Sequence, residues 1–207
     1  MTVYPASDRS LLVTFGNEIS LDHWRAVMRL TRVLEGVRGI LNLHPAYASV
    51  LIDFDPRLRT HDEVEALVHA APEVYEEPEP RTIEIPAIFD GPDLQEVARH
   101  TGLPTAQVVE KFIAADYLVY FVGFSTCFPY LGGLPPELAT PRLHTPRKHV
   151  PAGSIAIGGE QAGVYPLPSP GGWRLIGRTT LRLFDPKGSP PGLLRMGNRV
   201  RFVERPA

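Results

Sequence analysis

Apolar residues in the first 80 positions follow strand and helix spacings in turn, which predicts a small α/β unit. Leu11 to Phe15 is a β-forming run closed by Gly16, as expected of a strand. Ser20 suits a helix N-cap, and apolar residues at 21, 24, 27, 28 and 34 then share one helical face. Two more strands are predicted at 40–43 and 48–54. Thr60 followed by Glu63 predicts a capping box for a helix ending near residue 71.

The segment 73–80 is acidic and rich in proline, which is typical of a linker, and 81–88 alternates like a strand. The order β-α-β-β-α-β predicts a ferredoxin-like sandwich. The strand at 81–88 could equally begin a second domain. We therefore expect an N-terminal α/β sandwich at 1–80 and a second domain at 81–207.

After residue 117 the pattern changes to short β-forming runs separated by turn residues. Two short helices are predicted before this point, at 93–101 and 105–115. Strands are then predicted at 117–124, 154–158, 163–165, 173–177, 181–184 and 199–203. Of the 18 glycines and 22 prolines in the chain, 13 of each fall within 117–207. This density excludes a helical bundle and favours a β-barrel or sandwich, so the fold class is α+β.

Charge and cysteine content narrow the function classes. The net charge is −2, but residues 1–80 carry −6 and residues 117–207 carry +7. A basic C-terminal half attracts anions, or it is simply a scattered basic surface. The single Cys127 fits a reducing cytoplasm, and no apolar run approaches the ~20 residues of a membrane span. No Lys/Arg run or reading motif indicates nucleic-acid binding.

Familiar catalytic motifs are absent from the sequence. There is no phosphate-binding loop, G-x-S-x-G elbow or zinc motif, and His144 and His149 are too loosely placed to predict a metal site. Cys127 and Ser154 could be nucleophiles, but a packed thiol and a turn-stabilising hydroxyl are the favoured interpretations. The catalytic residues therefore stay unassigned.

Polar and aromatic residues gather among the turns between 117 and 179. Arginine forks suit carboxylate or phosphate groups, and aromatic rings suit a flat ligand or an interface anchor. The alternative is that the arginines are solvated and the rings belong to the core. The candidate substrate-binding residues are Tyr130, Arg142, Arg147, Gln161, Tyr165, Trp173 and Arg178.

Four stretches match the motifs of one protein family, and the resemblance to that family covers nearly the whole chain. They are FVGFSTCFPYLGGL (121–134), PRKHVPAGSIAIGGEQAGVYP (146–166), SPGGWRLIGRT (169–179) and GNRVRF (197–202). They resemble the KipI family, also known as the B-type subunits of 5-oxoprolinase or as allophanate hydrolase subunit 1, which forms part of some carboxyltransferase domains. The resemblance implies a cyclophilin-like β-barrel at 81–207. Thr126 and Cys127 stand where the family usually has Pro and Gly, which restricts a turn beside Phe128.

The resemblance also implies a function as one component of an ATP-dependent 5-oxoprolinase. Its expected partners are a KipA-type sister chain (the C-type subunit of 5-oxoprolinase) and an A-type subunit, with ATP bound by the complex or by a partner. Arg142, Arg147 and Gln161 would contact anionic or amide groups, and Tyr130, Tyr165 and Trp173 would shape the pocket. Two alternatives remain. One is a KipI-like inhibitor of histidine kinase autophosphorylation; the other is part of a biotin-dependent urea or allophanate-type carboxyltransferase, with biotin carried by other chains.

Overall fold

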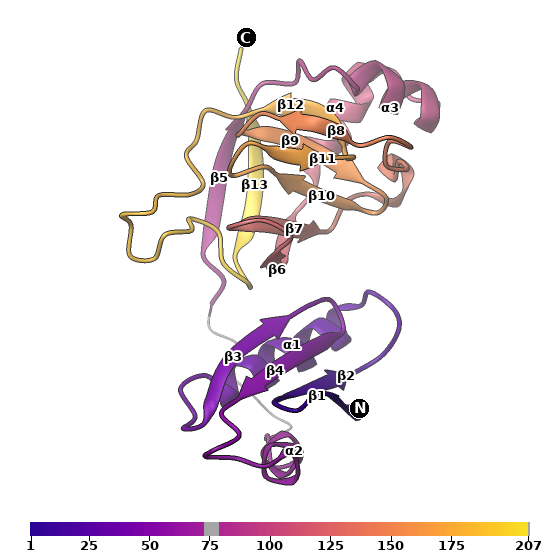
Figure 1. The fold of residues 1–207 in the computed structure, drawn as a ribbon. Coiled ribbons are helices and arrows are strands. Elements are labelled where there is room, and N and C mark those ends of the chain that lie inside the picture. Colours follow the sequence, from indigo (N-terminus) through magenta and orange to yellow (C-terminus); the bar gives the residue numbers. More distant parts are fainter. Residues whose placement is uncertain (73–78, 207) are drawn as a thin grey trace. The chain divides into compact units, whose positions relative to one another are not determined.

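The computed structural model describes residues 1–72 and 79–206, and it divides the chain into two units (Figure 1). Unit 1 is Met1–Glu79 and unit 2 is Pro80–Ala207. Most of the predicted linker, residues 73–78, lies outside the described part. Within that part, no helix is both long and apolar enough to cross a membrane.

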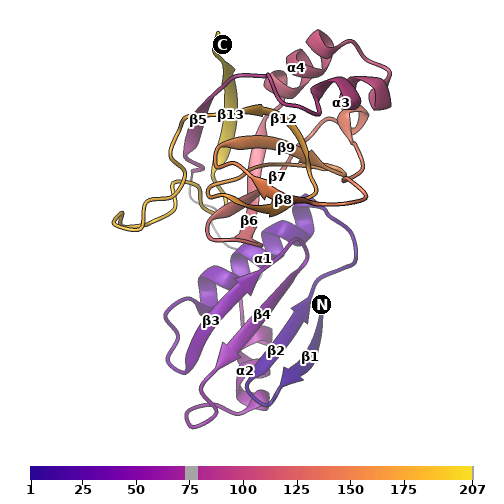
Figure 2. The same ribbon diagram turned by 45° about the horizontal axis from the view of Figure 1, so that its top comes forward.

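Unit 1 is a four-stranded antiparallel sheet with two helices on one face (Figure 2). The strand order is β1-β2-β4-β3, with β1 at Thr2–Ser7, β2 at Ser10–Thr14, β3 at Ile40–Pro45 and β4 at Ser49–Phe54. Helix α1 spans Leu21–Leu34 and is capped by Ser20, as predicted. Helix α2 spans His61–His69, and the predicted capping box between Thr60 and Glu63 is present.

The fourth strand of this sandwich is β1, which the sequence pattern missed. β1 is an edge strand with Pro5 at its centre, and most of its residues are exposed, so it shows no apolar alternation. The predicted last strand of the sandwich, 81–88, is β5 (Thr82–Ala87), and it belongs to unit 2. The α/β sandwich is therefore built from a β-β-α-β-β-α segment.

Unit 2 is a nearly closed barrel of seven strands (Figure 1). The order is β12-β9-β10-β7-β6-β13-β5, where β6 is Tyr117–Gly123, β7 Phe128–Gly132, β9 Ser154–Gly158, β10 Gln161–Val164, β12 Arg174–Arg178 and β13 Arg199–Glu204. The first and last strands approach each other at Ile88 and Arg178, whose backbones exchange two hydrogen bonds of 2.8 Å. This pair brings the two ends of the sheet together.

The barrel strands bury apolar side chains on both faces. Ile155, Ile157 and Val164 belong to the main core, which also includes side chains from α3 (Leu94–Thr101) and α4 (Thr105–Ala114). The residues between them point to the opposite face of the sheet, where a second cluster is centred on Phe128. The short pair β8 (Arg147–Val150) and β11 (Ser169–Gly171) contributes Val150 to that second cluster.

Residues 181–184, predicted as a strand, are not one. Leu183 is buried and Leu181 packs against the core, which explains the alternating pattern. The segment instead pairs with a proline-rich return, through hydrogen bonds from Leu193 N–H to Leu183 O and from Asp185 N–H to Pro191 O. Because prolines lack an N–H, this return cannot extend a ladder. A short 3₁₀ helix at Pro136–Leu138 completes the described elements.

Candidate functional site

A pocket of about 270 Å³ opens on the second apolar face of the barrel. Its floor consists of four aromatic rings, carried by β7, by the residue that follows β10 and by the residue that precedes β12. Its rim consists of turn residues and one arginine. The lining residues are Phe124, Phe128, Tyr130, Arg142, Leu143, Pro146, Tyr165, Pro170, Gly171, Gly172 and Trp173.

The four floor rings form one interlocked group around Phe128. The ring centroid of Phe128 lies 5.0 Å from Tyr165, 5.2 Å from Tyr130 and 5.3 Å from Trp173, and all three pairs are edge-to-face. Such contacts each add roughly 0.5–1.5 kcal/mol to simple area burial. The floor is therefore a rigid surface suited to a flat or apolar group.

Glycines bring the backbone close enough for these rings to lie where they do. A Cβ atom at Gly158 would overlap the ring of Trp173, and one at Gly171 would overlap the hydroxyl of Tyr165. A Cβ at Gly163 would lie 2.8 Å from Phe128 and 3.0 Å from Trp173. The Gly-rich motifs of this half of the chain thus shape the pocket as well as its turns.

Arg142 is the one charged side chain among the described residues that line the pocket. Its guanidinium carbon lies 5.4 Å from the centroid of Trp173, in a cation–π arrangement. Within residues 1–72 and 79–206, no carboxylate forms an ion pair with Arg142. The pocket therefore offers an aromatic floor and, at its rim, a positive charge with which no carboxylate of the described residues pairs.

The two tyrosine hydroxyls of the floor stay protonated at neutral pH. Burial raises the pKa of Tyr130 above its usual range, and the nearby charge of Arg142 opposes this only in part. Burial likewise raises the pKa of Tyr165, although a hydrogen bond with the Trp173 backbone lowers it in part. Both hydroxyls therefore keep the proton with which a phenol donates a hydrogen bond.

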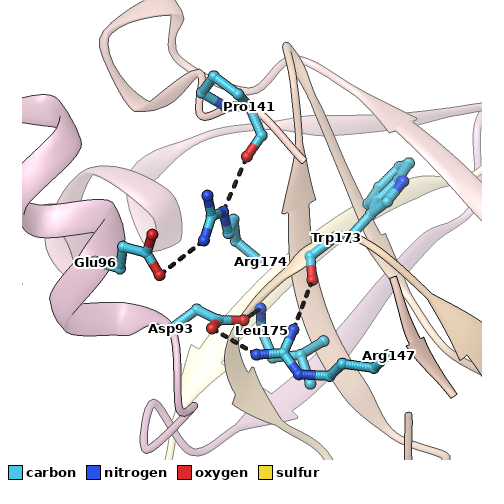
Figure 3. A network of polar contacts seen from close by, with 7 residues as sticks. All are labelled: Asp93, Glu96, Pro141, Arg147, Trp173, Arg174 and Leu175. Carbon is cyan, nitrogen blue, oxygen red and sulfur yellow. Dashed lines mark hydrogen bonds and ion pairs between the residues drawn. The ribbon is translucent and has the colours of Figure 1, made fainter. Parts of the chain in front are cut away.

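A network of charged residues lies behind the pocket wall (Figure 3). The buried carboxylate of Asp93 accepts a 2.6 Å hydrogen bond from Arg147 Nη2 and another of 2.6 Å from the backbone N–H of Leu175. Arg147 Nη1 also donates to the carbonyl oxygen of Trp173 at 3.5 Å. Figure 3 shows the Trp173 carbonyl turned toward Arg147 while its ring points away.

Arg174 links α3 to the segment that carries Arg142 (Figure 3). Its Nη1 lies 2.7 Å from Glu96 Oε2, on the first turn of α3. Its Nε donates to the carbonyl oxygen of Pro141 at 2.9 Å. On the other side of Arg142, the N–H of Leu143 donates to the carbonyl of Gly172 at 2.6 Å. The backbone around Arg142 is thus fixed on both sides.

Of the predicted binding residues, the structure brings together Tyr130, Arg142, Tyr165 and Trp173. Arg147 lies behind the wall, with its guanidinium engaged by Asp93. Arg178 is exposed and pairs with Asp90 at 2.9 Å, outside the pocket lining. Gln161 begins β10, and its Oε1 is buried without a hydrogen-bond partner among the described residues.

The turn at 123–127 contributes Phe124 to the lining of the pocket. Phe124 and Cys127 both have left-handed backbones, with φ of 61° and 62°. Phe124 is 66% exposed, and its ring meets Phe128 edge-to-face. Burial raises the pKa of the Cys127 thiol, which opposes a nucleophilic role and agrees with the packed interpretation.

Two further candidates are also placed by the structure. The hydroxyl of Ser154 is buried and donates to the carbonyl of Pro151 at 2.8 Å, as expected of a turn serine. His144 and His149 are both exposed. Among the described residues, no three His, Cys, Asp or Glu side chains gather as metal ligands would.

Sequence reasoning missed Asp93, Glu96 and Arg174. Asp93 precedes a helix and therefore resembles an ordinary N-cap, yet its side chain makes no capping bond and instead binds β12 and Arg147. Arg174 lies inside the SPGGWRLIGRT motif, next to a residue that was predicted to bind the ligand. No local signal connects Asp93 to Arg147, because 54 residues separate them.

Comparison with known proteins decides the family. The model of the carboxyltransferase domain, subdomain C and D, matches residues 1–194. The chain belongs to this family. A relative from Escherichia coli O157:H7, named as the B subunit of 5-oxoprolinase, is 48% identical over 190 residues, which cover 87% of this chain and 83% of that protein.

Solved structures with the same fold extend the comparison. The crystal structure named TTHA0988 superposes with a TM-score of 0.89 at 37% identity, and the match covers 96% of this chain. This chain spans 40% of the length of that one. The Kluyveromyces lactis urea amidolyase matches 98% of this chain with a TM-score of 0.80 at 21% identity, which supports the fold alone. The predicted sandwich-plus-barrel architecture is thereby confirmed.

Proposed function

We propose that this chain is the B-type subunit of an ATP-dependent 5-oxoprolinase, in which 5-oxo-L-proline, ATP and water yield L-glutamate, ADP and phosphate. The observation that carries the proposal is the 48% identity, over most of both chains, to a protein named as the B subunit of 5-oxoprolinase. That name implies that the chain works with others. We take these to be an A-type chain and a KipA-type chain (the C-type subunit), acting in the cytoplasm.

The aromatic pocket of unit 2 is the proposed substrate site. 5-Oxoproline is a small flat lactam with one carboxylate, and the pocket combines a ring-lined floor with the positive charge of Arg142. Arg142 would bind the carboxylate, and the ring would lie against Trp173 and Phe128. Protonated Tyr130 or Tyr165 would donate to a substrate oxygen.

The role of this chain is to hold the lactam while ATP activates it. Hydrolysis of an unactivated lactam is slow, and transfer of the γ-phosphoryl group of ATP to the amide oxygen would release ADP and make the ring carbon electrophilic. Water would then add to that carbon, the C–N bond would break with the nitrogen leaving as the amine, and a second water would hydrolyse the resulting acyl phosphate to L-glutamate and phosphate. The sequence has no phosphate loop, so ATP would bind to a partner or at a shared interface.

The test is co-expression of this chain with the A-type and C-type chains of the same organism, followed by a 5-oxoproline-dependent ATPase assay. The assay measures the glutamate formed and the phosphate released, which should be equal in amount. The proposal expects activity only when all three chains are present. Failure of the three chains to associate, or full activity without this chain, would contradict it. In that case, a pull-down against histidine kinases with autophosphorylation as readout examines the inhibitor alternative.

A further inference from the structure

The start of α3 is held tightly against the strand that carries one wall of the pocket. A Cβ at Gly91 would overlap the backbone of Ile176, so the chain at 88–93 lies directly on β12. Asp93 then forms two hydrogen bonds with the backbone of one residue. Its own N–H donates to Leu175 O at 2.9 Å, and its carboxylate accepts from Leu175 N–H at 2.6 Å.

The second oxygen of the same carboxylate fixes Arg147. The side chain of Asp93 is 6% exposed and that of Arg147 is 28% exposed, so this pair is more shielded from solvent than the pair of Asp90 and Arg178 nearby. With one nitrogen on Asp93, the guanidinium fork presents another to the Trp173 carbonyl. The ring of Trp173, which lines the pocket, extends from that fixed peptide.

We infer that Arg147, held by Asp93, is a positioning residue for the pocket: it fixes the Trp173 peptide and thereby the ring on which the substrate and Arg142 lie. This inference rests on the proposed function for its kinetic consequence. It departs from the sequence-based expectation that Arg147 contacts the ligand, because Nη1 and Nη2 both donate to groups behind the wall.

The competing explanation is that the pair of Asp93 and Arg147 only stabilises the fold, and the chain contains a matched control for it. Asp90 pairs with Arg178 at 2.9 Å and also joins the 88–93 segment to β12. This pair is exposed, and neither residue lines the pocket. Asp93→Asn and Asp90→Asn are therefore the same chemical change in the same segment, and only the first reaches Trp173.

The experiment measures kcat and KM for 5-oxoproline in the assembled complex. We expect Asp93→Asn and Arg147→Met to raise KM about tenfold with kcat changed less than about twofold, because a loosened wall weakens binding of the substrate. Arg147→Lys, which keeps the charge but not the fork, should give an intermediate KM. Asp90→Asn should leave both constants unchanged. Equal KM values for Asp93→Asn and Asp90→Asn would overturn the inference.

A second readout uses this chain on its own, labelled with 5-fluorotryptophan. The chain has two tryptophans, Trp24 in unit 1 and Trp173 at the pocket, so each ¹⁹F resonance is assigned with a Trp24→Phe variant. Asp93→Asn should move or broaden the Trp173 resonance and leave that of Trp24 in place, whereas Asp90→Asn should move neither. An unmoved Trp173 resonance would overturn the inference.

The two readouts separate failure of this inference from failure of the proposed function. An active complex in which Asp93→Asn behaves like Asp90→Asn refutes positioning and leaves the function standing. An inactive complex refutes the function, and the ¹⁹F shift still decides whether Asp93 holds Trp173. If Asp93→Asn fails to fold, Arg147→Lys supplies the same comparison, since it keeps an ion pair with Asp93.

Discussion

The guanidinium of Arg142 lies over the ring of Trp173, 5.4 Å from its centroid, and both groups line the same pocket. The ring holds the cation at the rim but carries no charge of its own. Unlike a carboxylate partner, it therefore leaves the positive charge of Arg142 unneutralised. A bound carboxylate can therefore complete the charge balance of the site. In the proposed site, binding of the substrate carboxylate depends on that relationship.

Removing the cation should weaken substrate binding more than it affects turnover. Arg142→Met is expected to raise KM for 5-oxoproline by roughly tenfold to a hundredfold, since charge-assisted hydrogen bonds contribute about 1.5–3 kcal/mol. Arg142→Lys should recover part of the loss. Steady-state kinetics on the assembled complex measure both. Lys148→Met, a change at an exposed basic residue on β8, is the control and should leave KM unchanged.

The pocket should also be sensitive to a single added methyl group at Gly171. Gly171→Ala is expected to displace the side chain of Tyr165, because the new Cβ would overlap its hydroxyl. We expect KM for 5-oxoproline to rise several-fold, by about 1 kcal/mol or more of lost binding. At the adjacent Gly172 the nearest atom would be 3.6 Å from a Cβ, so Gly172→Ala is the matched control. Equal effects of the two substitutions would contradict the assigned wall.

Cys127 lies in a backbone conformation that favours glycine, which is the residue the family usually has there. With φ at 62°, Cys127→Gly should relieve strain and stabilise unit 2 by about 0.5–1 kcal/mol. Cys127→Ala keeps the Cβ and should bring no such gain. Urea unfolding followed by the emission of Trp173, in a Trp24→Phe background, measures both. A loss of stability in Cys127→Gly would mean that thiol packing outweighs the strain.

Unit 1 should lose stability in acid through one carboxylate. Hydrogen bonds from the Arg57 side chain and backbone lower the pKa of Asp55 from 3.8 to about 2. Because the folded pKa lies below the unfolded one, this stabilisation is complete above about pH 4 and is lost as the pH falls toward 2. Urea unfolding followed through Trp24 should show the loss in that window. Asp55→Asn should remove this part of the pH dependence, and an unchanged acid slope would contradict the assignment.

The sequence predicted most elements because their signals are local. Ser20 and Thr60 cap the two helices of unit 1 where the pattern placed them, since an N-cap depends on residues three apart. The edge strand β1 was missed because Pro5 and exposed neighbours carry no apolar alternation. Residues 181–184 alternate like a strand, but their partner segment contains Pro190 and Pro191 and cannot form a ladder.

The site was predictable in its residue types and less so in its roles. Aromatic residues and arginines among Gly-rich turns pointed to Tyr130, Arg142, Tyr165 and Trp173, which do meet in one pocket. Arg147 could not be distinguished from Arg142 by sequence, because its partner Asp93 is 54 residues away. Only the three-dimensional arrangement separates an arginine that faces the pocket from one that supports its wall.

The central claim is that the pocket beside Trp173 binds 5-oxoproline, and ¹⁹F NMR of the assembled complex tests it most directly. The complex carries 5-fluorotryptophan in this chain alone and is titrated with 5-oxoproline, then with 2-pyrrolidinone, which has the same ring without the carboxylate. We predict a saturable shift of the Trp173 resonance with 5-oxoproline, a much weaker response to 2-pyrrolidinone, and no response from Trp24. An active complex whose Trp173 resonance does not respond to saturating 5-oxoproline would contradict the claim.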